Sequence, residues 1–562
     1  GQITPTCGMG YPQADIKKED GFLYYIQETK SEFSYGVFAY TVLKKEFAEI
    51  YFTIKTSKDG DDFDRIAKEE LKEAARTGYD KLKEEHIKWW KKYWEKASLK
   101  INDELEKTYY RSWYLFASCS RKGNYPMPLQ GVWTADDGKI PPWRGDYHHD
   151  TNTQLSYQAY LKADRLAEGE VFLDYLWNLK PRFEQFANEF YGVDGLLIPG
   201  VSTIDGKPMG GWSQYALSPT MSIWVALSFD EYYLYTGDIL FLKDKAYPFF
   251  YEVGKAIMGL LEEKNGKLYL PLSTSPEIYD DTPEAYLIPN SNFDLALIRY
   301  LFVRLQEYSE ILNKEKTAYE EILSKLDEIA VIDGYIGLNR VERLKESHRH
   351  FSHLMCLYPL HLIHYDTKEH RELYKKALSE IEKLGTGMWV GFSFAMCAQL
   401  YAMAENGADA YEKLRQFADG FVEENGFHLN GDYKQKGYST FHYRRFTLEA
   451  LFGFCDALQE MLLQEYRGYL HLFPAIPKQW ENEGIEFNGF RSYGGILVSG
   501  KIKNGYLSEI RLKIPEKMLI KIKNTFPTKR ARLETDKKTQ IIEETEGFFV
   551  LELEKGNAKI TG

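Results

Sequence analysis

Apolar side chains recur at positions i, i+3 and i+4 through most of the chain between residues 104 and 465. This spacing places apolar residues on one face of an α-helix, so the region is predicted to be helical almost throughout. Twelve helices are expected, with approximate spans 104–122, 150–165, 169–191, 219–235, 238–262, 291–313, 315–328, 351–364, 367–384, 388–405, 408–422 and 444–465.

The loops between these predicted helices are of two kinds. Those before the second, fourth, sixth, eighth, tenth and twelfth helices concentrate polar and aromatic residues, whereas the others are short and plain. No repeat of fixed period runs through the region, which argues against an open solenoid. We call the six loops with many polar and aromatic residues the rich loops. If six helical hairpins close into a ring, these rich loops all lie at one end of it. The alternation therefore favours an (α/α)6 toroid with one cleft, in a mainly α protein with flanking β regions.

The segments that flank this barrel have other patterns. Residues 21–56 alternate apolar and polar positions, which predicts β-hairpins in an N-terminal β region over 1–61. That region is too short to bury a β core alone, so it is either an incomplete sandwich or a layer against the next domain. A charged helical linker is expected over 62–103, the catalytic barrel over 104–465, and a C-terminal β domain over 466–562.

Composition narrows the classes of protein to consider. The net charge is −12, whereas binding to nucleic acid needs a basic surface, and no apolar run approaches the roughly 18–20 residues of a membrane span. We therefore expect neither a nucleic-acid partner nor a membrane. The first residues show no signal pattern, and the composition fits a cytoplasmic and a secreted protein equally, without indicating an oligomeric state. Five scattered cysteines, four of them in apolar helical contexts, predict buried free thiols.

Residues 129–154, LQGVWTADDGKIPPWRGDYHHDTNTQ, are the richest in candidate chemistry. Aromatic rings stack on the faces of sugars, while acid, amide and imidazole groups bind hydroxyls and transfer protons. The segment therefore favours a carbohydrate-active enzyme. Its candidate residues are Trp143, His148, His149, Asp150 and Asn152.

Glu277 is the candidate general acid. It lies in LPLSTSPEIYDD, a loop with Ser and Pro before a predicted helix, and Asp280, Asp281 and Glu284 follow closely. Like-charge repulsion from these neighbours is expected to raise the pKa of Glu277, as a general acid requires. The alternative is a carboxylate that caps the helix.

Two further loops each offer a carboxylate beside an amide. Asp150 and Asn152 open the second predicted helix, and Asp432 lies close to Asn430 in HLNGDY. Each pair fits either a base with an amide that holds a water, or residues that cap a helix or a turn.

The segment HRHFSH at residues 348–353 holds three histidines at a spacing that could bind zinc, but Arg349 between them would repel a metal ion. We therefore expect no metal and no cofactor, and we assign Arg349 and His350 to a polar ligand. One or two tryptophans in or beside the rich loops are expected to line a sugar subsite, and the others to pack in the core. The candidates are Trp133, Trp143, Trp212, Trp224 and Trp389.

At these motifs the sequence resembles the inverting α-L-fucosidases of glycoside hydrolase family 95. The motifs lie between about residues 105 and 490, and they are LQGVW followed by PPW and an amide-bearing helix start, STSPE, HRHFSHL with YP, TGD at the end of the fourth helix, and ALQEMLLQ followed by LFPAIPKQW. The resemblance implies an (α/α)6 barrel with β domains on its N-terminal and C-terminal sides, and an oligosaccharide or glycan as substrate.

Carried over motif by motif, the resemblance implies roles for five residues. The glutamate of SPE is Glu277, which would be the general acid. The pocket histidine of the family falls on His148 and a pocket tryptophan on Trp224. The Arg-His pair of the family falls on Arg349 and His350.

The sequence departs from the family pattern at the positions that activate water. The family has two asparagines separated by one residue and an aspartate in a DGN motif. Here the first asparagine is replaced by Asp150, Asn152 is kept, and DGN becomes Asn430-Gly431-Asp432. Acid and amide are exchanged at both loops, which makes a direct carboxylate base available.

We therefore expect an exo-acting glycoside hydrolase of the α-L-fucosidase or α-L-galactosidase type that inverts configuration. Glu277 would protonate the leaving oxygen, and Asp150 or Asp432 would activate a water that Asn152 holds. Inversion needs the acid and the base roughly 6.5–9.5 Å apart.

Two alternatives remain at this point. One is a glycoside phosphorylase, in which phosphate replaces the base and basic side chains hold it; the candidates are Arg349, Lys434, Arg444 and Arg445. The other is a sugar-binding relative in which the acid–amide exchanges have abolished turnover.

Overall fold

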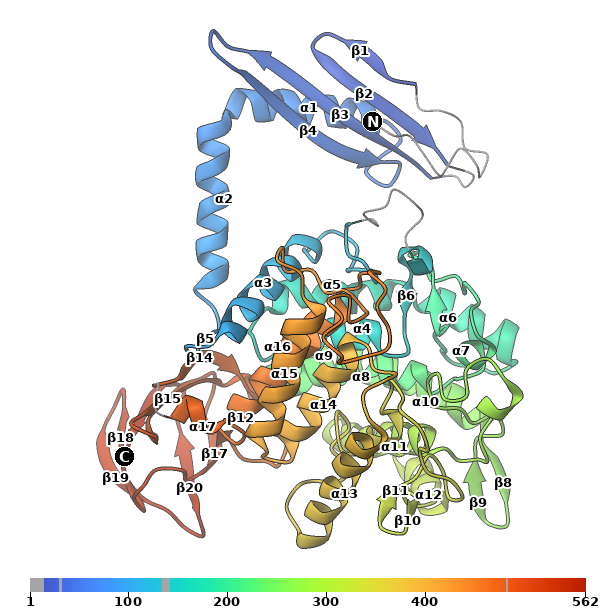
Figure 1. The fold of residues 1–562 in the computed structure, drawn as a ribbon, viewed down its shortest axis with the longest axis vertical. Coiled ribbons are helices and arrows are strands. Elements are labelled where there is room, and N and C mark those ends of the chain that lie inside the picture. Colours follow the sequence, from blue (N-terminus) through green and yellow to red (C-terminus); the bar gives the residue numbers. More distant parts are fainter. Residues whose placement is uncertain (1–14, 30–32, 134–141, 482–483) are drawn as a thin grey trace. The chain divides into compact units, whose positions relative to one another are not determined.

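The structure is a computed structural model, and it describes residues 15–29, 33–133, 142–481 and 484–562 (Figure 1). Cys7 and residues 134–141 of the loop at 129–154 lie outside the described residues. The chain divides into two compact units, residues 1–96 with 134–141 and residues 97–133 with 142–562. Within the described ranges, no helix has both the length and the apolar character that crossing a bilayer requires.

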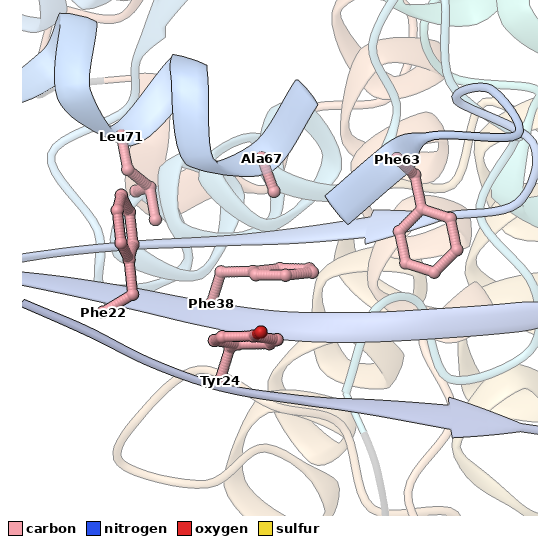
Figure 2. Packing of buried hydrophobic residues seen from close by; sticks show 6 residues of the cluster. All are labelled: Phe22, Tyr24, Phe38, Phe63, Ala67 and Leu71. Atoms are coloured by element: carbon pink, nitrogen blue, oxygen red, sulfur yellow. The ribbon is translucent and has the colours of Figure 1, made fainter. Parts of the chain in front are cut away.

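The first unit is an antiparallel sheet in the order β1-β2-β3-β4, with helix α1 against one face (Figure 2). Its elements are β1 (Lys17–Glu19), β2 (Phe22–Glu28), β3 (Ser34–Leu43), β4 (Ala48–Thr56), α1 (Phe63–Thr77) and α2 (Tyr79–Trp94). Every second side chain of a strand points to the same face, so alternate apolar residues meet the helix. The strand residues Phe22, Tyr24 and Phe38 form a core with three residues of α1. These are Phe63, Ala67 and Leu71.

The other face of this sheet carries exposed apolar side chains, among them Leu23, Ile50, Phe52 and Ile54. The described part of the N-terminal β region is therefore one sheet and one covering helix, without a second packed sheet. The predicted helical linker is divided into α1 and α2 at Gly78, whose φ of +80° is a conformation that glycine adopts without steric cost.

The second unit holds the helical barrel. Its helices are α3 (Glu104–Cys119), α4 (Asn152–Ser156), α5 (Leu166–Asn178), α6 (Lys180–Phe186), α7 (Ser213–Ala216), α8 (Met221–Thr236), α9 (Ile239–Phe241), α10 (Tyr247–Leu260), α11 (Asn292–Ile311), α12 (Thr317–Lys325), α13 (Lys368–Leu384), α14 (Gly391–Met403), α15 (Gly407–Phe421), α16 (Glu449–Leu462) and α17 (Lys478–Glu481). α14, α15 and α16 pack side by side (Figure 1). α8, α14 and α16 are buried around most of their surface, as the inner helices of a toroid must be. Cys119, Cys356, Cys397 and Cys455 are buried free thiols, as predicted.

Two predicted helices are much shorter than expected. The helix predicted over 351–364 is a single 3-10 turn at Ser352–Leu354, because Pro359 lacks an N–H and its ring does not fit inside a helix. The helix predicted over 150–165 is α4 alone, followed by turns that end at Asp164, whose φ of 54° lies in the left-handed region.

The C-terminal β domain begins after α16 and contains a seven-stranded sheet in the order β19-β18-β21-β16-β15-β14-β5, with β17 and β20 paired beside it. Its strands are β14 (Glu486–Arg491), β15 (Leu497–Lys503), β16 (Tyr506–Ile514), β17 (Met518–Lys523), β18 (Arg530–Thr535), β19 (Thr539–Glu543), β20 (Phe548–Leu553) and β21 (Gly556–Thr561). The edge strand β5 (Ser98–Lys100) comes from the segment before the barrel and pairs with β14. The remaining pairs are short: β6 (Tyr147–His148) with β7 (Val201–Ser202), β8 (Glu262–Lys264) with β9 (Lys267–Tyr269), β10 (Val331–Ile332) with β11 (Tyr335–Ile336), and β12 (Leu463–Gln464) with β13 (His471–Leu472).

Candidate active site

Five of the six rich loops meet at a cleft of about 680 Å³. The walls include residues of the segment 142–152, of the loop around α7, of the loops at 277 and 349–350, and of the loop that leads into α16. The convergence expected from the alternation of loops is therefore present. The predicted site residues that line the cleft are Trp143, His148, Asp150, Asn152, Trp212, Glu277, Arg349, His350 and Asn430.

Cationic and hydroxyl groups surround the carboxylate of Glu277. The guanidinium of Arg349 forms an ion pair with Oε2, and Nε2 of His350 lies 3.0 Å from the same oxygen. The phenol of Tyr215 donates a hydrogen bond to Oε1. Burial alone would raise the pKa of Glu277, but the charges of His350 and Arg349 outweigh it and hold the pKa well below its usual range.

This environment differs from the one expected for Glu277. The neighbouring carboxylates were predicted to raise its pKa, but Asp281 accepts hydrogen bonds from the backbone N–H and the hydroxyl of Ser213 instead. Glu277 itself has a φ of 59°, a left-handed conformation that is unusual for a residue with a Cβ. The turn therefore presents Glu277 to Arg349 and His350, which are distant in sequence.

Asp150 lies close to Glu277 but has few partners. Its side chain is 2% exposed, Oδ2 lies 3.8 Å from Nε2 of His350, and Oδ1 has no hydrogen-bond partner among the described residues. Burial raises the pKa of Asp150 and outweighs the nearby imidazoles of His148 and His350, which lower it. The closest oxygens of Asp150 and Glu277 are within 4.8 Å of each other. The two carboxylates therefore share one small space but differ in the direction of their pKa shifts.

His148 is a charged hydrogen-bond donor of the cleft. Strand β6 places it beside Asp146, whose Oδ1 lies 2.7 Å from Nδ1 of His148. Burial would lower the pKa of His148, but Asp146 and the charges of Asp150 and Glu277 raise it to about 9. At neutral pH this imidazole is protonated, so it can donate to a sugar hydroxyl or stabilise a neighbouring carboxylate.

A buried carboxylate that was not predicted from the sequence, Glu449, lies near Asn152. The nearby amide of Asn152 is one of the groups that lower the pKa of Glu449, the first residue of α16, and the hydroxyl of Thr447 donates to Oε1 of Glu449 at 2.8 Å. Glu449 is 1% exposed, and burial raises its pKa to about 7. One feature of the sequence could have indicated Glu449: it is an acidic residue within the apolar run LEALFGF. A charged side chain that is buried in such a run needs a polar partner.

Three predicted site residues lie outside the cleft. Asp432 is fully buried, and its carboxylate accepts the backbone N–H groups of Lys436 and Tyr438 at 3.0 and 2.9 Å, so it shapes its own loop. His149 is fully buried between hydroxyl groups, and burial lowers its pKa to about 3. Trp224 packs edge-on against a phenylalanine and lines a separate small cavity.

Aromatic side chains form much of the cleft wall. Trp212 stacks on Tyr215, with ring centroids 6.0 Å apart and planes 3° apart. Asn430 donates from Nδ2 to the phenol of Tyr443 at 3.3 Å. Together with Trp143 these rings offer flat apolar surfaces beside charged groups, which is the combination that sugars need.

A metal ion would meet a competing charge in this cleft. Asp150, Glu277 and His350 offer three ligand atoms within 4.8 Å of one another, but the guanidinium of Arg349 already forms an ion pair with the carboxylate of Glu277. The three histidines of residues 348–353 form no ligand cluster among the described residues.

Comparisons with known proteins agree with the cleft chemistry. Residues 83–462 match the Glycosyl hydrolase family 95 catalytic domain. "Alpha-L-fucosidase 2" of Arabidopsis thaliana is 32% identical over 413 residues, which cover 71% of this chain and 48% of that protein. "Probable alpha-fucosidase A" of Aspergillus niger is 23% identical over 485 residues, covering 76% of this chain and 58% of that protein. The chain thus spans about half the length of these curated relatives.

Solved structures share the fold. A "putative kojibiose phosphorylase from human microbiome" has a TM-score of 0.68 at 12% identity, covering 97% of this chain and 81% of that one. An α-L-rhamnosidase of Streptomyces avermitilis has a TM-score of 0.51 at 11% identity, covering 83% and 42%. At such identities the likeness shows the architecture alone, and the predicted (α/α)6 barrel with flanking β regions is confirmed.

Proposed function

We propose, on the premise that this chain belongs to glycosyl hydrolase family 95, that it is an exo-acting glycosidase that removes a terminal α-L-fucosyl or α-L-galactosyl residue with inversion. One observation carries the proposal. Glu277 and Asp150, whose pKa values are shifted in opposite directions, share a cleft with the amide of Asn152, and a third carboxylate, Glu449, lies near that amide. Carboxyl groups with separated pKa values in one pocket are the usual basis of acid–base catalysis on glycosides.

Glu277 is assigned as the general acid. In this scheme it takes up its proton when the substrate binds. In the free cleft Arg349 and His350 keep Glu277 ionised. Sugar hydroxyls that accept hydrogen bonds from these two side chains would draw them away from the carboxylate. The pKa of Glu277 would then rise, because burial favours the neutral form. Glu277 would therefore be protonated only when a sugar is bound.

Asn152 and Glu449 are assigned to the water. The amide of Asn152 lines the cleft and can accept a hydrogen bond from a water, and the carboxylate of Glu449 lies near that amide. With a pKa near 7, Glu449 can take up a proton near neutral pH, whereas an ordinary glutamate is a weaker base. Glu449 does not itself line the cleft, so in this scheme it acts through Asn152: as the water attacks the anomeric carbon, its proton passes to the amide oxygen of Asn152 while the amide N–H gives a proton to the carboxylate of Glu449.

The spacing of Asp150 and Glu277 argues against Asp150 as the base of an inverting enzyme. Their closest oxygens are within 4.8 Å, which is nearer to the roughly 5–5.5 Å of retaining enzymes than to the 6.5–9.5 Å that leaves room for a water. Asp150 is therefore assigned to the sugar, as an acceptor for a hydroxyl beside the cationic His148.

The phosphorylase alternative is less well supported. Four basic side chains were its candidates for holding phosphate, but Lys434 donates to the backbone carbonyls of Asp419 and Val422, and Arg444 is paired with Glu423, so that only Arg445 of the four has no ion pair among the described residues. Arg349 is paired with Glu277. Hydrolysis needs none of these groups to be free.

A screen with aryl α-glycosides, including the L-fucoside and the L-galactoside, tests the proposal. We expect release of one of these two sugars, unchanged by inorganic phosphate, with the β-anomer as the first product in proton NMR. Release of the α-anomer first would make Asp150 a nucleophile and overturn the inverting scheme. A requirement for phosphate would establish the phosphorylase, and inactivity on every glycoside would favour the sugar-binding relative.

A further inference from the structure

The mouth of the cleft contains two arginines, Arg144 and Arg445, that have no anionic partner among the residues that the structure describes. Arg144 lines the cleft, and Arg445 lies against two rings that line it. Both side chains are exposed, and neither guanidinium has an ion pair or hydrogen bond within the described ranges.

Arg445 is held in place by aromatic rings. Its guanidinium carbon lies 5.6 Å from the ring centroid of Trp143 and 5.7 Å from that of Tyr443. These contacts orient the planar guanidinium by cation–π attraction without neutralising its charge. The N–H groups therefore stay available for a ligand.

Trp143 and Arg144 have a strained backbone. Their φ angles are 56° and 59°, and two successive residues with side chains in the left-handed region are costly. Such strain amounts to about 1–3 kcal/mol per residue and is found mostly where a binding site fixes the conformation. Here it places an aromatic face and a cation next to each other at the entrance.

Arg444 provides the contrast. It is the immediate neighbour of Arg445, but its guanidinium is paired with Glu423 and lies over the ring of Tyr433, which does not line the cleft. Two adjacent arginines thus differ in one respect that matters for a ligand: one charge is neutralised and the other is not.

We propose that the leaving-group side of the cleft is a subsite for an acidic sugar, one that carries a carboxylate or a sulfate ester. This inference rests on the proposed function, in which an exo-acting enzyme leaves the rest of the glycan at the mouth. Arg445 and Arg144 bind the oxyanion, for which the fork of a guanidinium is well suited, and Trp143 stacks on the sugar ring. In this arrangement the residues deeper in the cleft bind the terminal sugar. Arg445, Arg144 and Trp143 bind the acidic sugar next to it.

Three disaccharides test the subsite. They share the terminal sugar that the aryl-glycoside screen identifies, and they differ only at C6 of the second sugar, which carries a hydroxyl, a carboxylate or a sulfate ester. We expect kcat/KM at low ionic strength to be roughly tenfold higher for the acidic substrates than for the neutral one, and the preference to shrink in added salt. The carboxylate and sulfate arms distinguish the two kinds of acidic sugar.

Two variants localise the effect. Arg445→Gln should reduce kcat/KM on the acidic substrates more than on the neutral one, so that the preference falls to about twofold or less. Arg444→Gln removes the same charge one residue away and should keep the preference of the wild-type protein. Equal kcat/KM on all three substrates, or an equal effect of both variants, would overturn the subsite while hydrolysis of the aryl glycoside still stood.

Failure of the proposed function is distinguishable from failure of the subsite. If the wild-type protein cleaves no aryl glycoside, the methyl glycosides of a uronic acid and of the matching neutral sugar are titrated by calorimetry. Tighter binding of the uronic acid that is lost in Arg445→Gln and kept in Arg444→Gln supports the subsite. No difference between the two methyl glycosides would reject it.

Discussion

Glu277 and Glu449 occupy two parts of the same site. The pKa values of these two glutamates are shifted in opposite directions. Both are largely buried, with side chains 16% exposed at Glu277 and 1% at Glu449. Arg349 and His350 hold the pKa of Glu277 well below its usual range, whereas at Glu449 burial outweighs the smaller effects of Thr447, Asn152 and the charge of His148 and raises the pKa to about 7. Burial acts in the same direction on both groups, so the neighbouring cations make the difference.

The two carboxylates also differ in whether a bound substrate can change their pKa values. Arg349 and His350 line the cleft beside Glu277, so a ligand that accepts hydrogen bonds from them would change the charge environment of Glu277. Glu449 faces Asn152 and Thr447 behind the cleft wall, so its pKa is fixed by the fold. A glycosidase needs this division, because the acid must gain a proton while the base side stays ready for water.

The sharpest test of the comparison is Glu277→Gln, which removes the acid and keeps its shape. We expect kcat/KM on an oligosaccharide to fall roughly 10³–10⁴-fold, because the leaving oxygen then departs without a proton. An aryl glycoside with a good leaving group should lose much less, and steady-state kinetics on both substrates measure this. Glu284→Gln, an exposed position of the same loop, is the control with wild-type rates. Equal losses on both substrates would remove Glu277 from the acid role.

Asn152→Ala tests the other side of the site. Without the amide the water loses its position, and we expect kcat to fall roughly 10²–10³-fold on both the aryl glycoside and the oligosaccharide. The effect should be independent of the leaving group, unlike that of Glu277→Gln. Asn430→Ala, a cleft amide bonded to Tyr443, should change KM more than kcat. A wild-type kcat in Asn152→Ala would show that the water is held elsewhere.

Glu449→Gln tests the raised pKa through stability. The pKa of Glu449 is raised from an ordinary 4.5 to about 7, so between these values the unfolded chain gives up a proton that the folded protein keeps. The contribution of Glu449 is therefore present below pH 4.5 and lost as the pH rises through 7. Relative to Glu449→Gln, the wild-type free energy of unfolding should fall by as much as about 3 kcal/mol over this window. Urea unfolding of both proteins at pH 5 and pH 7.5 measures it, and a constant difference would show that Glu449 is ionised throughout.

Arg349→Gln tests the lowered pKa of Glu277 directly. Removing the guanidinium should raise the pKa of Glu277 by about one unit or more, since a paired cation shifts a carboxylate by that amount. Titration of the ¹³C carboxyl resonance of Glu277 reads the shift, and Arg444→Gln is the matched control. Saturation of the wild-type protein with the released sugar should move the resonance in the same direction. If neither change alters the titration, Arg349 does not govern the charge of Glu277.

The sequence predicted the parts of this protein that depend on local pattern. Helical periodicity and the alternation of rich and plain loops predicted the toroid, and the same loops contained Glu277, Asp150, Asn152 and Arg349, which the structure brings to one cleft. The departures are also local in origin. Pro359 stopped a helix that its apolar neighbours favoured, and Gly78 divided the predicted linker helix.

The predicted site residues that lie outside the cleft show where a pattern is insufficient. Asp432, His149 and Trp224 are polar or aromatic residues close to rich loops, and they support those loops or pack beneath them without reaching the cleft. Glu449 lies in an apolar run that gave no reason to place it beside Asn152. Residue type does not say which way a side chain points, and the backbone of each loop decides that.

By itself the sequence determined the fold class and the set of polar and aromatic groups that the cleft draws on, because hydrophobic periodicity and loop composition are properties of neighbouring residues. Only the tertiary structure decided how these groups are charged. The pKa of Glu277 depends on His350, 73 positions away in the chain, and that of Glu449 depends on its burial at the start of α16 beside a residue of α4. Charge interactions act through space over a few ångströms, so they are set by which segments the fold brings together.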